Sequence, residues 1–172
     1  MHYEDGRYTI TYNGEIYNYI ELREELKSNG YHFRSESDTE VLLALYHQKR
    51  ENCLSLLDVM FAFAIWDNNE KTLFCARDRF GEKPFHYFYD GKKFVFGSEI
   101  KALFSAGIEK KINYENLQFY LDTGKNELGT DTFFHNIKKL KQGHYLVLKD
   151  NAITITKYYS ISIDDKIIYK ND

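Results

Sequence analysis

The residues best suited to chemistry in this 172-residue sequence form a short run, Asn13-Gly14-Glu15. A side-chain amide beside an unhindered glycine N–H can present two donors to one developing oxyanion, as acyl transfer requires. Asn-Gly is also a strong signal for a tight turn, because both residues tolerate positive φ. Taken alone, the run favours a turn over a site, although such a turn could itself place the two donors.

Asp38 is the second candidate, within the run Ser37-Asp38-Thr39-Glu40. This run has the capping-box pattern of a helix start. Helix capping therefore ranks ahead of a ligand role for Asp38. A carboxylate at a helix start can also bind a ligand ammonium group through a charge-assisted hydrogen bond. Position in the sequence does not decide between the two roles.

One strand and two helices are predicted to position these candidates. Residues 8–12 alternate Tyr-Thr-Ile-Thr-Tyr, which is the period of a half-buried strand. A first helix is expected to begin near Asn18, with Glu21 as its capping partner, and to end before Gly30. The second helix is expected to begin at residue 37 and to carry apolar side chains on one side.

The remaining sequence favours short strands joined by turns. Hairpins are predicted within residues 60–76, 85–96 and 145–158, and short helices over 98–103 and 114–121. Helices and hairpins in this order predict an α+β fold with antiparallel sheets rather than alternating βαβ units.

Charge and hydropathy exclude several classes of protein. The net charge is −3, from 23 basic and 26 acidic residues, and gives no reason to expect nucleic acid or an anionic membrane as a partner. The longest apolar run, residues 59–66, is far shorter than the roughly 20 residues that span a bilayer. Arg77-Asp78-Arg79 is expected to form an exposed charged turn.

The two cysteines, Cys53 and Cys75, show neither close pairing nor metal-site spacing, which fits a reducing cytoplasm. Cys75 lies in a strand-like apolar run and is expected to be a buried, inert thiol. The six histidines are scattered, so no metal site is assigned. Phosphate-loop, dinucleotide-binding and G-x-S-x-G motifs are absent from the sequence. These patterns alone indicate a cytoplasmic α+β domain of unassigned role.

Several longer motifs occur together and in a fixed order. They are NGEIYN (residues 13–18), SDTE (37–40), MFAFAIWD (60–67), ARDRFG with Lys83-Pro84 (76–84) and SEIKAL (98–103). In this order they resemble the class II glutamine amidotransferase domain of asparagine synthetases, in the N-terminal nucleophile hydrolase group. The first two are shared with relatives such as glucosamine-6-phosphate synthase, whereas the last two favour asparagine synthetase. The resemblance covers nearly the whole chain.

The resemblance implies the fold and the roles of the candidate residues. The expected fold is an incomplete four-layer αββα sandwich of the N-terminal nucleophile hydrolase type. Asn13 and Gly14 would be the side-chain and main-chain oxyanion donors. Asp38 would hold the α-ammonium group of glutamine, and Glu15 would line the same pocket.

The resemblance also implies partners. Such a domain hydrolyses L-glutamine and sends ammonia to a synthetase domain, where ATP and Mg serve the amidation of aspartate. Residues 1–158 would form the amidotransferase domain and residues 159–172 a linker stub toward that synthetase domain. No cofactor, nucleic acid or membrane is expected for this chain, and a homodimer is left open.

The sequence departs from the family at its beginning. The family's nucleophile is an N-terminal cysteine, whereas this chain opens Met1-His2-Tyr3, and Met1 aligns with a methionine inside the family domain. The opening strands and the carboxylate-binding arginine are therefore expected to be missing. We expect no hydrolysis by this chain alone, and association through an open sheet edge.

Smaller departures from the family occur at four positions. Val59 stands where a turn glycine is usual, so the local turn is expected to differ. Glu82, Phe85 and His86 lie on the face expected to meet the synthetase domain.

Three other interpretations stay open. The chain could be a non-catalytic glutamine-binding or interaction module, the amidotransferase domain of a related enzyme such as glucosamine-6-phosphate synthase, or a truncated product without a role of its own.

Overall fold

The computed structural model describes residues 1–125 and 129–161, so the predicted linker lies outside the described residues from position 162 onward. The strands are β1 (His2–Tyr3), β2 (Tyr8–Ile16), β3 (Val59–Asp67), β4 (Thr72–Arg77), β5 (His86–Tyr89), β6 (Phe94–Gly97), β7 (Ile137–Lys139), β8 (His144–Lys149) and β9 (Ala152–Lys157). The helices are α1 (Tyr19–Ser28), α2 (Asp38–Lys49), the 3-10 helix η1 (Arg50–Ser55), α3 (Ile100–Ser105) and α4 (Tyr114–Thr123).

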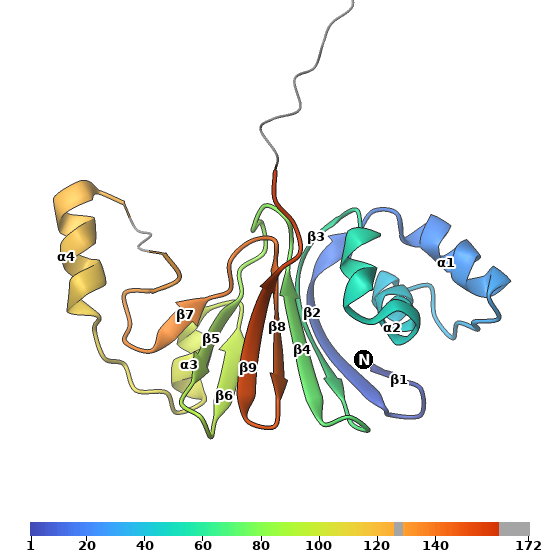
Figure 1. Ribbon diagram of the computed structural model, residues 1–172, viewed down its shortest axis with the longest axis horizontal. Helices are drawn as coiled ribbons and strands as arrows, with labels where there is room; N and C mark the ends of the chain where they lie inside the picture. Colours follow the sequence, from blue (N-terminus) through green and yellow to red (C-terminus); the bar gives the residue numbers. More distant parts are fainter. Residues whose placement is uncertain (126–128, 162–172) are drawn as a thin grey trace, which may run out of the picture.

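Two antiparallel sheets lie between two groups of helices, as Figure 1 shows. The larger sheet has the order β1-β2-β3-β4-β8-β9 and the smaller sheet the order β6-β5-β7. Helices α1 and α2 cover the outer face of the larger sheet, and α3 packs on the smaller one. The predicted α+β sandwich with antiparallel sheets is therefore confirmed.

Strand β3 shows how the larger sheet packs on both of its faces. Phe61, Phe63 and Ile65 join the core beneath the helices, whereas Ala62 and Ala64 join the core between the two sheets. Alternate side chains of a strand point to opposite faces, so bulky residues serve one core and small residues the other. The continuous apolar run in the sequence reflects this burial on both sides.

Helix α2 is buried on all sides over residues 40–46, and not only on one apolar side as predicted. It packs against β2 on one side and α1 on the other. Helix α1 ends as expected, because Gly30 adopts φ +87 and Tyr31 N donates back to Leu26 O at 3.1 Å.

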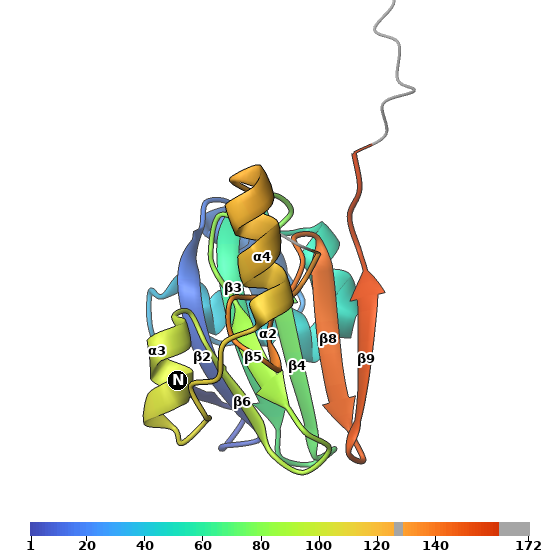
Figure 2. The same ribbon diagram turned by 90° about the vertical axis from the view of Figure 1, so that its left-hand side faces the viewer.

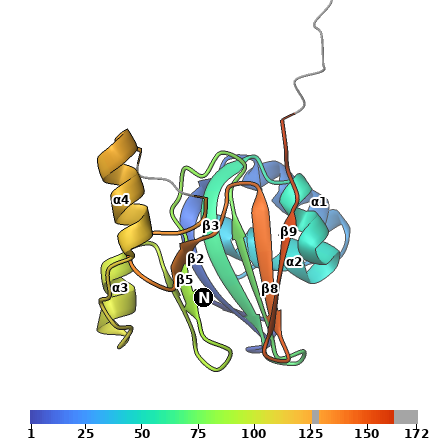
Figure 3. The same cartoon turned by 60° about the vertical axis from the view of Figure 1, so that its left-hand side comes forward.

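Helix α4 stands away from the sheets in Figures 1 and 3, and in the view of Figure 2 it lies in front of them. It begins at the N-cap Asn113 and ends at Gly124, which is left-handed. Tyr114 and Leu121 on this helix are largely exposed. None of the helices in the described ranges is both long and apolar enough to cross a bilayer.

The three predicted hairpins are confirmed as β3–β4, β5–β6 and β8–β9. The turn of the last hairpin consists of Asp150 and Asn151, which both have positive φ. Val59 pairs with Ile16 at the end of the β2–β3 ladder, so it is the first residue of a strand rather than part of a turn.

Two predicted turns do not form as expected. The favoured turn at Asn13-Gly14 does not form, because both residues lie inside β2 and pair with Ala62 and Phe61 of β3. The run at residues 77–79 is not an exposed charged turn, since Asp78 is only 1% exposed. Asn13 and Gly14 stay in a strand because β3 pairs with β2 along its whole length. Asp78 is buried because its carboxylate accepts hydrogen bonds from backbone N–H groups.

Candidate functional site

Strand β2 and the start of α2 enclose a surface depression of about 470 Å³. Its lining residues are Gly14, Glu15, Ile16, Tyr17, Tyr19, Glu36, Ser37 and Asp38. Three of the four sequence-predicted site residues, Gly14, Glu15 and Asp38, are thus brought together at one place. We call it the Asp38 depression.

The carboxylate of Asp38 is tied to β2 rather than to its own helix. Its Oδ2 accepts hydrogen bonds from the Tyr12 hydroxyl at 3.1 Å and from the Ile16 N–H at 3.2 Å. The N-cap is Ser37, whose Oγ accepts from Thr39 N at 3.1 Å, so the capping role predicted for Asp38 is wrong. On its other oxygen, Oδ1, the described contact is the Thr39 hydroxyl at 3.3 Å. Oδ1 is therefore the oxygen best able to accept from a ligand.

Tyr12 is a residue of this site that the sequence patterns did not identify. Burial, with the Asp38 carboxylate as a further cause, raises the pKa of Tyr12, so the hydroxyl keeps its proton and donates to Asp38. The two-residue period of the strand could have indicated it, because Tyr12 and Gly14 share one face of β2.

Gly14 is required by a close approach between strands rather than by positive φ. A Cβ at this position would lie 2.4 Å from the carbonyl oxygen of Met60 and 2.9 Å from the Cα of Phe61. Any larger residue would have to push β3 away.

The N–H of Gly14 points to the open edge of β2. Tyr17 N donates to Asp58 O at 2.9 Å, so Tyr17 and Asp58 form a hydrogen-bonded pair of the ladder. Gly14, three residues before Tyr17, lies opposite Phe61 in the same register. Hydrogen-bonded and non-hydrogen-bonded pairs alternate along an antiparallel ladder, so Gly14 belongs to a non-hydrogen-bonded pair. Strand β1 pairs only with Tyr8 and Thr9, and the described residues supply no partner for the Gly14 N–H.

Asn13 points to the opposite face of β2 from Asp38. Its Nδ2 donates to Ser98 Oγ at 3.1 Å, and it does not line the Asp38 depression. The Ser98 carbonyl is in turn bonded to His86 Nδ1 at 3.0 Å. Burial lowers the pKa of His86, which favours the neutral ring in this polar chain between the sheets.

Neither cysteine lines the Asp38 depression, and both are buried. Cys53 lies in the core beneath the helices and Cys75 in the core between the sheets, each with no exposed surface. Burial raises the pKa of both thiols, so neither forms a thiolate readily. The predicted inert character of Cys75 agrees with this environment.

The comparisons with known proteins agree with the motifs. A family model described as a glutamine amidotransferase domain matches residues 1–159. Glutamine-hydrolysing asparagine synthetase 3 of Bacillus subtilis is 39% identical over 160 residues, which cover 92% of this chain and 26% of that protein. A putative asparagine synthetase of Methanocaldococcus jannaschii is 37% identical over 164 residues, covering 93% and 31%. The chain thus spans less than a third of the length of these relatives.

A solved structure, the glutamine phosphoribosylpyrophosphate amidotransferase of Bacillus subtilis, shares the fold with a TM-score of 0.65. Its sequence is 21% identical, and the match covers 92% of this chain and 31% of that one. A glutamine aminotransferase class-II domain protein from Silicibacter pomeroyi matches with a TM-score of 0.51 at 12% identity, over 90% of this chain and 69% of that one. At these identities the likeness concerns the fold.

Proposed function

Because the chain belongs to the family of glutamine amidotransferase domains, we propose that it is the glutamine-binding portion of a glutamine-hydrolysing asparagine synthetase. The observation that carries the proposal is the pairing, in one depression, of a fixed carboxylate with an unpartnered backbone donor. Asp38 supplies the first and Gly14 the second.

Asp38 binds the α-ammonium group of L-glutamine in this proposal. Two donors already hold its Oδ2, so the carboxylate is oriented before a ligand arrives and Oδ1 can accept the ammonium. A charge-assisted hydrogen bond of this kind is about twice as strong as a neutral one. Glu15 adds a second negative charge at the rim of the depression.

Gly14 is the proposed donor to the amide oxygen of a ligand in the depression, and Asn13, whose side chain lies on the other face of β2, is the proposed second donor where the ligand amide reaches past the edge of the strand. The Gly14 N–H is directed to the open edge of β2, where an oxygen can reach it. The Asn13 amide has two hydrogens, and Ser98 takes one of them, so the second is available to a ligand. Such donors stabilise negative charge as it develops on the oxygen.

The chain alone is proposed to bind glutamine without hydrolysing it. Hydrolysis in this chemistry needs a nucleophile that attacks the amide carbon, and the thiols of Cys53 and Cys75 are buried away from the depression. Transfer of ammonia to an ATP- and Mg-dependent synthetase domain that amidates aspartate is proposed for a longer polypeptide. Residues 1–158 would form its amidotransferase part.

The test is a titration of ¹⁵N-labelled protein with L-glutamine, followed by amide NMR signals. We expect the signals of Gly14, Ile16 and Thr39 to shift, and Asp38→Asn to weaken binding about tenfold or more. Asp58→Asn is the matched control, because Asp58 is exposed and outside the depression. Glutamine-induced shifts that spare Gly14 and Thr39 would disprove the site.

A glutamate-release assay on the same samples tests the second half of the proposal. The expected result is no release above the rate in buffer. Turnover by the purified chain would show that a nucleophile is present after all.

A further inference from the structure

The loop of residues 34–37 leads directly into Asp38, and two buried charged side chains converge on it. Glu40 comes from the first turn of α2 and is 5% exposed, and Arg23 comes from α1 and is 6% exposed. Charged side chains are seldom buried unless they are paired, so both must be held by specific contacts.

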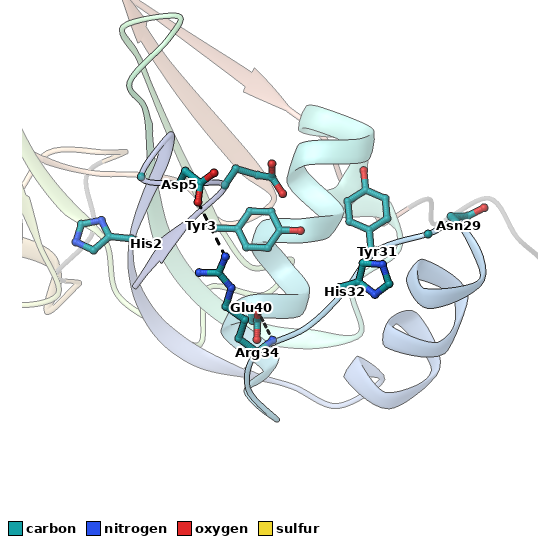
Figure 4. A pocket seen from close by; sticks show the side chains of 11 residues that line it. His2, Tyr3, Asp5, Asn29, Tyr31, His32, Arg34 and Glu40 are labelled. Carbon is teal, nitrogen blue, oxygen red and sulfur yellow. Dashed lines mark hydrogen bonds and ion pairs between the residues drawn. The ribbon is translucent and has the colours of Figure 1, made fainter.

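Glu40 accepts hydrogen bonds from three donors of this loop. Its two oxygens accept from Arg34 N at 2.9 Å, from Ser35 N at 2.8 Å and from the Ser35 hydroxyl at 2.6 Å. Figure 4 shows the Glu40 side chain reaching from α2 to the backbone of Arg34. Burial alone would raise the pKa of Glu40, but these hydrogen bonds and Arg23 outweigh it, and the pKa is lowered.

Arg23 donates hydrogen bonds to acceptors of the same loop. Its guanidinium donates to the Ser35 carbonyl and to the Glu36 carboxylate, and it lies over the ring of Phe33 at 5.0 Å. Ser35 is therefore bound through its N–H and hydroxyl by Glu40 and through its carbonyl by Arg23. Side chains from α1 and α2 thus both hold Ser35, which lies three positions before Asp38.

The Ser35 hydroxyl links Glu40 to the residue that precedes Asp38. It donates to Glu40 and accepts from Ser37 N at 3.3 Å, and Ser37 is the N-cap of α2. Asp38 is the next residue, and its carboxylate must meet Tyr12 and Ile16 of β2. The loop thus sets where α2 begins relative to the strand.

We propose that Arg23 and Glu40 are positioning residues for Asp38, and that through Ser35 they give the Asp38 depression its preference for ligands with an α-ammonium group. This inference rests on the proposed function, since it concerns the same depression. Neither residue needs to touch the ligand. A purely structural role would lower the stability of the protein without changing which ligand it prefers.

Two ligands separate these roles. L-Glutamine and 4-carbamoylbutanoate share the amide and the carboxylate, but only glutamine has the ammonium group. The binding of each to the full chain is followed by the amide signals of Gly14 and Thr39. We expect the wild type to prefer glutamine by about tenfold, which corresponds to one charge-assisted hydrogen bond.

Glu40→Gln is expected to reduce this preference to about threefold or less while leaving the affinity for 4-carbamoylbutanoate unchanged. Ser35→Ala keeps both charges, removes only the linking hydroxyl, and should reduce the preference in the same direction. Glu25→Gln, on the exposed side of α1, is the matched control and should behave as wild type. An unchanged preference in folded Glu40→Gln and Ser35→Ala, or an equal weakening of both ligands, overturns the inference.

Hydrogen exchange at Ile16 gives a ligand-independent reading. Its N–H is bonded to Asp38, so misplacement of Asp38 should speed exchange at Ile16 about tenfold in Glu40→Gln and not in Glu25→Gln. Faster exchange with no ligand preference in the wild type would retain the positioning of Asp38 but disprove its ammonium role. Unchanged exchange at Ile16 in Glu40→Gln would disprove the positioning itself.

Discussion

Two loops of the molecule, residues 34–37 and 78–83, are each held by one guanidinium and one carboxylate. In the first loop the charges belong to Arg23 and Glu40, and in the second to Arg77 and Asp78. In both, the carboxylate accepts from backbone N–H groups and the guanidinium donates to backbone carbonyls. The two loops differ in where these charges come from.

The loop of residues 78–83 is held mainly by its own neighbours in sequence. Asp78 accepts from four successive backbone N–H groups at distances of 2.5 to 3.0 Å, those of Phe80, Gly81, Glu82 and Lys83. Arg77 donates to the carbonyls of Gly81 and Lys83 at 2.7 Å, and to that of Leu140 at 2.8 Å.

The loop of residues 34–37 is held by side chains from two helices, α1 and α2. Its shape therefore depends on how those helices pack, whereas the second loop is shaped by adjacent residues. The same pair of charges can thus either build a loop locally or tie a loop to distant elements. We expect only the second use to transmit a change in packing to a neighbouring site.

Replacement of Asp78 should have the largest effect on stability. Asp78→Ala leaves four backbone N–H groups without their acceptor, and we expect the free energy of unfolding to fall by about 3 to 4 kcal/mol. Urea denaturation measures the change, with Asp58→Ala on the exposed surface as the control. A loss below about 1 kcal/mol would mean that water replaces the carboxylate, and the local loop would then be the weaker of the two.

Replacing the arginine of the second loop should also cost more stability than replacing that of the first. Arg77→Met removes donors from three carbonyls and is expected to cost about 2 to 3 kcal/mol. Arg23→Met is expected to cost about 1 kcal/mol, because Glu36 remains solvated and the buried Arg23 Nε has no acceptor among the described residues. Parallel urea titrations compare them. A larger cost for Arg23→Met would reverse the ranking of the two loops.

Glu40 should make the loop of residues 34–37 sensitive to acid. Its folded pKa lies below the ordinary value of 4.5, so its stabilising contribution is complete above pH 4.5 and is lost as the pH falls through the folded pKa. As the pH falls from about 5 to about 3, the wild type should lose more stability than Glu40→Gln does. Thermal unfolding across this range measures the difference. Equal slopes in the two proteins would show that Glu40 does not contribute.

The side chain at the tip of the second loop should matter least. Phe80 is 62% exposed and makes a T-shaped contact with the Tyr159 ring, so Phe80→Ser should change the unfolding free energy by less than about 0.5 kcal/mol. Phe33→Ser, directly before the first loop, should cost about 1 kcal/mol, because Phe33 lies beneath the Arg23 guanidinium. Calorimetry of both variants provides the comparison. A cost above about 1 kcal/mol for Phe80→Ser would contradict the local character of its loop.

Much of the fold could be predicted from local sequence signals. The Asp90-Gly91 and Asp150-Asn151 turns join the strands that they were expected to join. The start of α2 at Ser37 followed from its capping pattern. These features are set by a few adjacent residues, so a single sequence contains enough information to find them.

Contacts between distant residues could not be predicted in this way. Asn13-Gly14 has the composition of a turn, and only the close approach of β3, which would leave a Cβ at Gly14 just 2.4 Å from a backbone oxygen, shows why a strand needs this glycine. The bond from Tyr12 to Asp38 crosses 26 residues. Arg77-Asp78-Arg79 has the composition of a surface turn, and its burial depends on the fold around it. Local periodicity does not contain such contacts, so the site was indicated by the motifs and not by the spacing of apolar residues.

Strand β3 also limits how the larger sheet can assemble. Shifted by one position, it would push phenyl rings into a gap that already holds Phe85 and Phe96, and would leave methyl groups opposite the helices. Solvent could not relieve either misfit, because the β3 side chains on both faces are buried. Side-chain bulk therefore selects one alignment of the strands, and the same alignment fixes Gly14 opposite Phe61. Enlarging Ala62 or Ala64 should spread the sheets apart, and so alter the Asp38 depression without touching it.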